Sequence, residues 1–311
     1  MSLASPRPLA GRSVSSPAEV RSHAWEGFRC ESRVVRSGAP RLAPVLMIGG
    51  AFQRKESWGR MERALLDDMD VVTVDPPGWG SGGVLPAHHG ADLLADAVCH
   101  MLTELGLPRL NIFSGSYGTA IAYRIAQKHP GQVGRMVLVG TMTEIPAHAR
   151  LGMRQALDCL RTGDMEEFAE RSLDFLMNAA REDRIAGAAK VRRFLRRRLT
   201  NLAEEERAQT LANSERLLQH EMVDLSLPPA APVLAVTGEH DSFTTPDRCR
   251  GMAATCPDSR FAVVSGADHM LYLERTAELA DLTTRFLAEE SLDGLPYCSY
   301  VERVNPPTEY A

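Results

Sequence analysis

A serine in a short run of small residues is the first side chain of this sequence that could do covalent chemistry. Residues 114–118 read SGSYG, after the apolar run Leu110–Phe113 and before a helical pattern over residues 119–128. Small residues two positions before and after a serine let a strand and a helix approach across a sharp turn that exposes the hydroxyl. Ser114 stands where the pattern usually has glycine, and serine is nearly as small. We predict that Ser116 is a nucleophile, with an ordinary strand-to-helix turn as the alternative.

A serine hydroxyl is a weak nucleophile and needs a histidine base that a carboxylate orients. When the serine lies on such a turn, the expected chain order is serine, acid, histidine. Asp241 follows the apolar run Val233–Val236, and His269 follows the run Phe261–Val264. We therefore predict a catalytic triad of Ser116, Asp241 and His269.

Four neighbouring residues are rivals for these roles. Glu144 follows an apolar run at residues 136–139 and is an alternative acid. His240 is an alternative base, although a residue beside the acid cannot easily contact that acid and also face the serine. Glu239 lies on the wrong side of its turn, and we expect Asp268 to stabilise the loop of the histidine.

A tetrahedral oxyanion needs two N–H donors. We place one on Tyr117, directly after the nucleophile, and the other on Ala51, which follows two glycines after the apolar run at residues 44–48. A Gly-Gly turn without a role is the alternative, and no phosphate-binding glycine pattern follows. The residues that we expect to contact the substrate are Gly50, Phe52, Trp58, Met142 and Met270.

Short apolar runs alternate with helical patterns along most of the chain. We expect strands at residues 29–36, 44–48, 71–74, 110–113, 136–139, 233–236 and 261–264, and helices at 58–66, 91–105, 119–128 and 275–289. Apolar strands alternating with helices indicate an α/β fold with a mostly parallel central sheet flanked by helices. The candidate residues follow strands, where ligands bind in such sheets.

A long helical stretch interrupts this alternation. We predict a flexible leader at residues 1–22, a core at 23–140 and 228–290, an inserted all-helical cap at 141–227 and a C-terminal tail at 291–311. Such a cap would select the acyl group and restrict the access of water.

Composition excludes several classes of protein. The 311 residues are 44% hydrophobic and 24% charged, with a net charge of −5, which is ordinary for a globular protein and gives no general attraction to nucleic acid or anionic membranes. We find no secretory signal and no apolar stretch of the roughly 20 residues that a membrane span needs. The six cysteines lack metal-site spacing, so we expect free thiols, no metal and a cytoplasmic protein. Lysine occurs only at positions 55, 128 and 190, and this preference for arginine indicates a GC-rich, bacterial genome.

Four motifs in order make residues 30–290 resemble the α/β-hydrolase superfamily. Residues 47–52 (MIGGAF) with Ser57-Trp58 resemble its oxyanion loop, residues 75–81 (DPPGWGS) its D-x-P-G-x-G-x-S loop, and GEHD and GADH its acid and base signatures. Gly49 replaces the histidine of the oxyanion loop, and Ala51 replaces its aromatic residue. The relatives that cleave halides or epoxides use aspartate at the nucleophile position, so Ser116 argues against both activities.

Two features of the predicted cap bear on the substrate. A basic run over residues 190–198 is expected to be a solvated face paired with acids such as Glu204–Glu206. The alternative is a docking site for an anionic carrier protein or a CoA-bound acyl group. The residues that could line an apolar acyl pocket, or simply form the cap core, are Met142, Met153, Met165, Met177, Phe168 and Phe175.

The triad and the resemblance together imply a serine hydrolase that cleaves an ester or thioester of a small to medium apolar acyl group, without a cofactor. Three alternatives stay open: an acyltransferase with a non-water acceptor, a C–C bond hydrolase or lyase using the same triad, and a ligand-binding receptor with little or no turnover.

Overall fold

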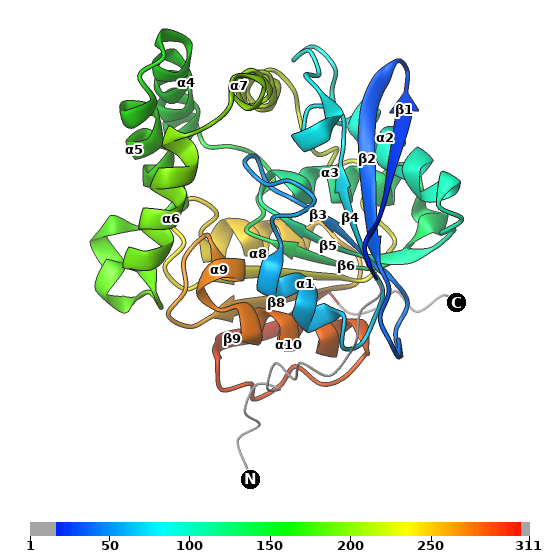
Figure 1. The fold of residues 1–311 in the computed structure, drawn as a ribbon. Helices are drawn as coiled ribbons and strands as arrows, with labels where there is room; N and C mark the ends of the chain where they lie inside the picture. The colour runs from blue at the N-terminus through cyan, green and yellow to red at the C-terminus, as the bar shows by residue number, and fades with distance from the viewer. Residues whose placement is uncertain (1–16, 306–311) are drawn as a thin grey trace.

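A single nine-stranded sheet organises residues 17–305, the part of the chain that the computed structural model describes (Figure 1). The strand order across it is β1-β2-β4-β3-β5-β6-β7-β8-β9. The strands are β1 (Glu19–Trp25), β2 (Phe28–Val35), β3 (Val45–Ile48), β4 (Val71–Asp75), β5 (Leu110–Gly115), β6 (Val133–Val139), β7 (Val233–Gly238), β8 (Ser259–Val264) and β9 (Cys298–Asn305).

The centre of the sheet, from β4 to β8, is parallel, and antiparallel strands flank it on both sides. Both faces of the parallel strands are covered. In β3, Leu46 and Ile48 pack toward α2 and α3, whereas Val45 and Met47 pack toward α1 and α10. This burial on both faces explains why the central strands read as continuous apolar runs.

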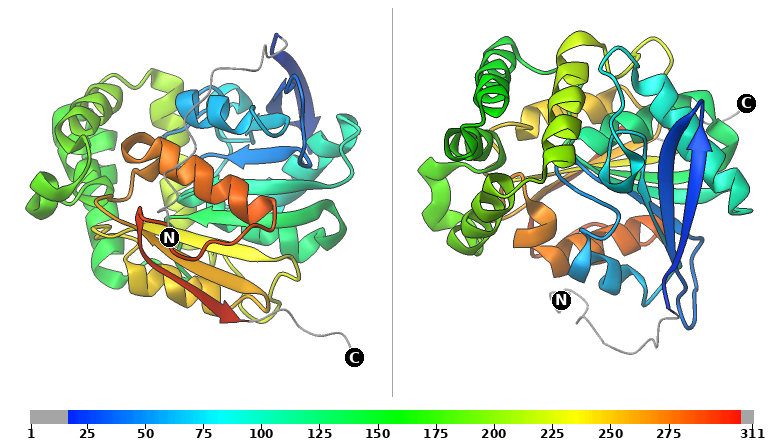
Figure 2. Two further views of the ribbon diagram at one scale, coloured as in Figure 1. Left: turned by 90° about the horizontal axis from the view of Figure 1, so that it is seen from below. Right: turned by 45° about the horizontal axis from the view of Figure 1, so that its top comes forward.

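Helices cover both faces of the sheet, as the left view in Figure 2 shows. The core helices are α1 (Gly59–Leu65), α2 (Ala91–Glu104), α3 (Tyr117–Lys128), α8 (Pro246–Ala254), α9 (Leu271–Glu274) and α10 (Thr276–Leu287), with 3-10 turns η1 (Gly80–Gly82) and η2 (Pro130–Gln132). Buried side chains of α2, α3 and α8 meet one face, and those of α1 and α10 meet the other.

Between β6 and β7 the chain leaves the sheet and forms only helices. These are α4 (Ala147–Thr162), α5 (Met165–Leu176), η3 (Ala179–Arg184), α6 (Ala188–Thr200) and α7 (Glu204–Gln219), which we call the cap. Gly163, in left-handed backbone at φ 81°, ends α4, and Asp164 then caps α5 by accepting the Glu167 amide at 3.1 Å. Helices α4, α5 and α6 share an apolar cluster around Phe168, and α7 packs against this cluster through Leu211 and Leu218 (Figures 1 and 2).

The predicted fold class is confirmed, and two expectations about the ends of the chain are wrong. β1 takes in residues 19–22 of the predicted leader, and residues 1–16 lie outside the described part. The predicted tail contains β9, which pairs with β8. Residues 275–289 form α10 over Thr276–Leu287, preceded by the short helix α9. Both missed strands lie at an edge of the sheet, where polar and half-exposed residues hide the strand pattern.

No helix within residues 17–305 is long and apolar enough to span a membrane. All six cysteines lie in this region as free thiols.

Candidate active site

Ser116 lies on the turn between β5 and α3, in backbone that serine rarely adopts. Its φ is 49° and its ψ is −119°, a strained conformation that the surrounding packing must hold. A Cβ atom on Gly118 would lie 2.5 Å from the Ile48 carbonyl oxygen, so glycine is required there. Ser114 is fully buried, and its hydroxyl donates to the Val137 carbonyl at 3.4 Å. The serine in place of the usual glycine is therefore accommodated without an unpaired hydroxyl.

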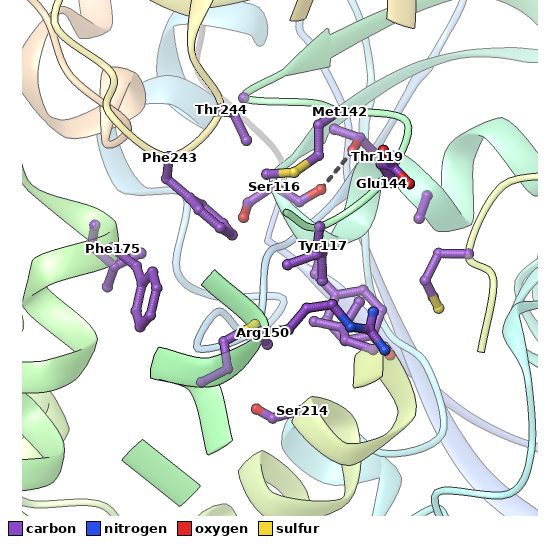
Figure 3. Close-up of a pocket in the computed structure, with 18 of the residues that line it drawn as sticks. Ser116, Tyr117, Thr119, Met142, Glu144, Arg150, Phe175, Ser214, Phe243 and Thr244 are labelled. Carbon is purple, nitrogen blue, oxygen red and sulfur yellow. Dashed lines mark hydrogen bonds between the residues drawn. The ribbon is translucent and has the colours of Figure 1, made fainter. Parts of the chain in front are cut away.

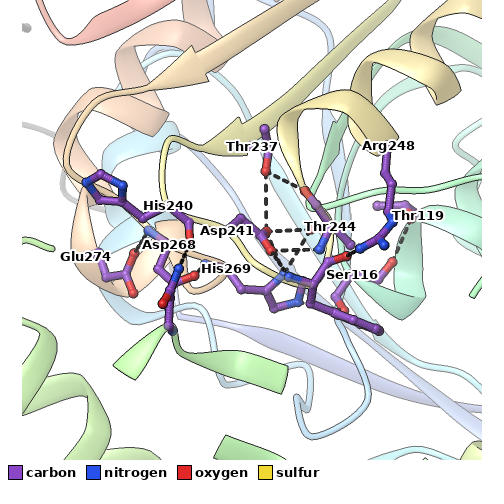
Figure 4. A network of polar contacts seen from close by, with 12 residues as sticks. Ser116, Thr119, Thr237, His240, Asp241, Thr244, Arg248, Asp268, His269 and Glu274 are labelled. Atoms are coloured by element: carbon purple, nitrogen blue, oxygen red, sulfur yellow. Dashed lines mark hydrogen bonds and ion pairs between the residues drawn. The ribbon is translucent and has the colours of Figure 1, made fainter. Parts of the chain in front are cut away.

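The three predicted triad residues meet at the carboxyl ends of their strands (Figure 4). His269 Nδ1 lies 2.9 Å from Asp241 Oδ2, and His269 Nε2 lies 3.1 Å from Ser116 Oγ. A carboxylate only accepts hydrogen bonds, so Nδ1 carries the proton and Nε2 presents its lone pair to the serine hydroxyl. The geometry can therefore transfer a proton from Ser116 to His269.

The carboxylate of Asp241 is buried within a set of donors. Its Oδ1 accepts the Phe243 amide at 2.9 Å and the Thr244 amide at 2.7 Å, and its Oδ2 also accepts the hydroxyls of Thr244 and Thr237. Burial alone would raise the pKa of Asp241, but the positive charge and hydrogen bond of His269 outweigh burial and lower it. Asp241 therefore stays ionised and fixes the orientation of the imidazole.

The pairing of His269 with Asp241 also explains the pKa of the histidine. Burial disfavours the charged imidazole, but the Asp241 carboxylate outweighs burial and raises the pKa of His269 above its ordinary value of 6.5. The negative charge of Asp241 therefore stabilises the imidazolium that forms when His269 takes a proton.

Two residues of this arrangement were not anticipated from the sequence. Thr244 Oγ1 lies 3.0 Å from His269 Nδ1 and also contacts Asp241, so it bridges acid and base. Gly140, at φ 62°, ends β6 beside the imidazole, where a Cβ atom would lie 3.0 Å from His269 Cε1. The threonine three residues after Asp241 was a usable signal, because aspartate commonly accepts amides two or three residues ahead in a turn.

Hydrogen bonds in the loop after β3 hold the two consecutive peptide groups on either side of the Gly50 Cα atom. The Gly50 amide donates to Gln53 Oε1 at 2.7 Å, and the Gly50 carbonyl accepts from the Trp79 indole at 3.1 Å and from the Gln53 amide at 3.2 Å. In a trans peptide the N–H points opposite to the preceding C=O. The Ala51 amide therefore points away from Trp79, and Ala51 lines the same cavity as Ser116.

A cavity of about 720 Å³ lies in front of Ser116, with walls from both the core and the cap (Figure 3). Of the predicted contacts, Phe52 and Met142 line it, as do Ala51 and Tyr117. Of the residues proposed for an acyl pocket, Met142, Met153, Phe168 and Phe175 line it, whereas Met165 and Met177 pack in the apolar cluster of the cap. Phe243 joins Phe175 to His269 through ring contacts at 5.5 and 5.6 Å.

Three of the predicted substrate contacts lie outside this lining. Trp58 is 3% exposed and packs edge-on against Phe113 and Tyr272, in the cluster that α1 and α10 cover. Met270 is buried in the apolar cluster of the cap, and Gly50 lies next to Ser116, where a Cβ atom on Gly50 would be 3.2 Å from Ser116 Cβ. Proximity in sequence to a catalytic residue does not fix the side of the chain that faces the cavity.

The four rivals lie away from the proton-transfer path. Glu144 is exposed on the cavity wall, and Glu239 Oε2 accepts the Gly266 amide at 3.0 Å. His240 contributes its carbonyl to Asn178 Nδ2 at 2.9 Å (Figure 4). Asp268 accepts the His269 amide at 2.8 Å, as expected for a residue that stabilises the loop.

The cap contacts the loops of the acid and the base through residues between α5 and α6. The Asn178 amide donates to Asp268 Oδ2, and its side chain donates to the His240 carbonyl. The Ala186 amide donates to the Gly266 carbonyl at 3.0 Å. Burial raises the pKa of Asp268 to about 6 and that of neighbouring Glu274, which accepts the Asp268 amide, to about 8.

Helix α7 is attached to the core differently, through polar side chains that bond to backbone carbonyls. Asn213 donates to Gly78 at 2.8 Å, and Gln209 donates to Gly80 and Gly83. The fully buried Arg216 donates to the carbonyls of Leu85, Pro86 and His89. These bonds hold α7 on the segment that also carries Trp79.

Three of the six basic residues in the run of α6 form ion pairs. Arg192 and Arg196 contact Glu170 at 3.0 and 2.7 Å, and Arg198 contacts Glu206. These pairs agree with a solvated, ion-paired face. No group of three or more His, Cys, Asp or Glu side chains within residues 17–305 is placed to hold a metal ion.

Comparisons with known proteins agree with this fold. The family model of the alpha/beta hydrolase fold matches residues 43–276. A 2-hydroxy-6-oxononadienedioate/2-hydroxy-6-oxononatrienedioate hydrolase of a Pseudomonas species is 25% identical over 260 residues, which cover 78% of this chain and 87% of that protein. A poly(3-hydroxyalkanoate) depolymerase of Ectopseudomonas oleovorans is 32% identical over 108 residues, 34% of this chain and 38% of that protein.

Among solved structures, the enol-lactonase from Burkholderia xenovorans LB400 superimposes with a TM-score of 0.73 at 18% identity. The match covers 86% of this chain and all of that one. At this identity the likeness concerns the fold alone.

Proposed function

Since the chain belongs to the alpha/beta hydrolase family and is a hydrolase, we propose that it is a serine hydrolase that cleaves a carboxylic ester or thioester through an acyl-enzyme on Ser116. The single observation that carries this proposal is the continuous path from Ser116 Oγ to His269 Nε2 at 3.1 Å and from His269 Nδ1 to Asp241 at 2.9 Å.

In the proposed reaction, His269 takes the proton of Ser116 as Oγ attacks the acyl carbon. Asp241 keeps the imidazole oriented and stabilises its cation. The imidazolium then protonates the leaving alcohol or thiol. Water, activated by His269, attacks the acyl-enzyme, and the acid leaves as Ser116 regains its proton.

The oxyanion of the tetrahedral intermediate would accept hydrogen bonds from the Ala51 and Tyr117 amides. Tyr117 is the first residue of α3, and N–H groups in the first turn of a helix have no partner within the helix. The Gly50 peptide, held by Trp79 and Gln53, keeps the Ala51 amide in one orientation before substrate binds. Donors fixed in advance need no reorganisation during the reaction, which is why they lower the barrier.

The cavity supports a small to medium acyl group with an apolar body. Phe52, Met142, Met153, Leu157 and Phe168 line it, and its volume lies in the range of small-molecule sites. These side chains would select the acyl group and keep most water from the acyl-enzyme.

Cleavage of a C–C bond by the same triad is the second candidate. The relative of the Pseudomonas species is named as the hydrolase of a 6-oxo dioate, and an oxo group is a ketone. A ketone carbonyl would lie at the same attack position, so the triad alone does not separate the two reactions.

The test of the proposed function is labelling with a fluorophosphonate, read by intact mass and peptide mapping. Wild type should gain one adduct, on Ser116, and Ser116→Ala should gain none. Incubation with short-chain esters, thioesters and a 6-oxo dioate then identifies the bond cleaved. A folded wild-type protein that gains no adduct on Ser116 would refute the proposal and favour a ligand-binding receptor.

A further inference from the structure

The cavity holds one arginine whose charge no carboxylate balances. Arg150 extends from α4 into the cavity lining, where Figure 3 draws it between Tyr117 and Ser214. Its guanidinium donates to the Leu218 carbonyl, and within residues 17–305 no carboxylate oxygen lies within 4 Å of it as an ion pair. A guanidinium offers five N–H donors, and the Leu218 carbonyl accepts from only one of its nitrogens, so donors of this cavity-lining side chain are left for a ligand.

Five other arginines of the cap differ from Arg150 in this respect. The arginines that form ion pairs with glutamate or aspartate on the same or a neighbouring helix are Arg161, Arg171, Arg192, Arg196 and Arg198. Arg150 is half-buried, and it lines the cavity together with the apolar side chains of Met153 and Leu157 on the same helix. A positive charge in such a setting is stabilised when an anion fills the space in front of it.

The remaining charged groups of the cavity do not supply that anion. Glu144 and Glu221 line the cavity and are both exposed, and neither forms an ion pair with Arg150. His220 Nε2 contacts the Ala87 carbonyl at 2.9 Å.

Building on the proposed function, we propose that Arg150 is a subsite for an anionic group of the substrate, a carboxylate or a phosphate, at a distance from the bond that Ser116 attacks. The planar guanidinium can donate two parallel hydrogen bonds to either group. A carboxylate would belong to an acyl chain with a second acid group, and a phosphate would belong to the leaving group. The apolar residues around the cavity would contact the carbon chain between the two ends.

Binding and turnover test this subsite separately. Adipate and monobutyl phosphate are titrated by calorimetry into wild type, Arg150→Gln, Arg150→Lys and Arg154→Gln. Arg154 lies exposed on the same helix outside the cavity lining and is the matched control. We expect Arg150→Gln to weaken binding of the matching anion about tenfold or more, Arg150→Lys to weaken it less, and Arg154→Gln to leave it unchanged.

In the turnover experiment, hydrolysis of monoethyl adipate is compared with that of diethyl adipate. Arg150→Gln should raise KM for the monoester about tenfold or more and leave the neutral diester within about twofold. Equal effects on the two esters, or anion binding that does not depend on Arg150, would overturn the subsite. Anion binding that depends on Arg150, without labelling of Ser116, would uphold the subsite and refute the proposed function, so the two failures are distinguishable.

Discussion

The strand-end loops and the cap build the same cavity by different means. Ser116, Asp241 and His269 each follow a strand of the sheet, and backbone amides or strained backbone fix each of them. The cap contributes side chains from helices that pack mainly on one another, and it contacts the core at Asn178, Ala186 and the polar face of α7. Proton transfer tolerates little displacement, so the rigid sheet carries it, whereas selection of the acyl group needs only shape and charge.

This contrast predicts that changes in the strand-end loops reduce kcat, whereas changes in the cap affect stability or KM. The expected effects below run from the largest to the smallest.

Asp241→Asn tests the loops most directly. We expect kcat to fall about 10³- to 10⁴-fold, because the amide no longer favours the tautomer with the proton on Nδ1. Only the neutral imidazole accepts the serine proton, so activity is lost as pH falls through the pKa of His269. Asp241 raises that pKa, and the acid limb of kcat/KM should therefore move to lower pH in the variant. The exposed Asp247→Asn is the control, and an unchanged pH profile in Asp241→Asn would contradict the assignment.

Trp79→Phe tests the peptide that orients the Ala51 amide. The phenyl ring keeps contact with Tyr117, whose ring lies 5.0 Å away, but it cannot donate to the Gly50 carbonyl. We expect kcat to fall about tenfold at unchanged KM, less than the roughly 10²- to 10³-fold cost of deleting an oxyanion donor outright. Trp25→Phe is the matched control, because the Trp25 indole N–H has no partner within residues 17–305. A rise in KM at constant kcat would show instead that Trp79 shapes the cavity.

Asn213→Ala tests the attachment of α7. The change leaves two buried groups, the Gly78 carbonyl and one Arg216 N–H, without a hydrogen-bond partner. We therefore expect the Tm to fall by about 5 °C. Hydrolysis of a short-chain ester at 25 °C should stay within about threefold of wild type. Asn201→Ala, at the exposed end of α6, should leave the Tm unchanged. A large loss of kcat in Asn213→Ala would show that α7 takes part in positioning the loops.

Glu274→Gln tests the buried carboxylate behind the base. Burial raises the pKa of Glu274 from 4.5 to about 8, so the neutral form is favoured in the folded protein. Its stabilising contribution is full below pH 4.5 and is lost as pH rises through about 8. Glutamine stays neutral and can still accept the Asp268 amide, so the Tm of the variant should fall less than that of wild type between pH 5 and pH 9. Differential scanning calorimetry between pH 5 and pH 9 measures this difference in Tm, with the exposed Glu204→Gln as the control. If the Tm of Glu274→Gln and of wild type changed in parallel with pH, the raised pKa of Glu274 would be refuted.

The sequence was sufficient to predict the sheet centre and the triad because both depend on local patterns. Buried parallel strands read as apolar runs, and Ser116, Asp241 and His269 directly follow such runs. The edge strands β1 and β9 were missed because pairing, not apolar side chains, defines them. Of the residues expected to contact the substrate, Phe52 and Met142 line the cavity, whereas Trp58 and Met270 pack in other clusters, because helix packing decides which side of a segment meets the cavity. The contacts of Thr244 with His269 and of Trp79 with the Gly50 carbonyl join segments far apart in sequence, which no local pattern encodes.

The bonds of Asn178 have a consequence for the timing of the catalytic cycle. The Asp268 carboxylate holds the amide of Asn178 and the amide of His269 at once. Any outward swing of the cap at residue 178 must break its bond to the residue that steadies the imidazole. While the cap is open for substrate entry or product release, the loop of His269 would therefore be held less firmly. Closure of the cap would re-form the bond between Asn178 and Asp268, so the protein would be best prepared to react when the cap is closed.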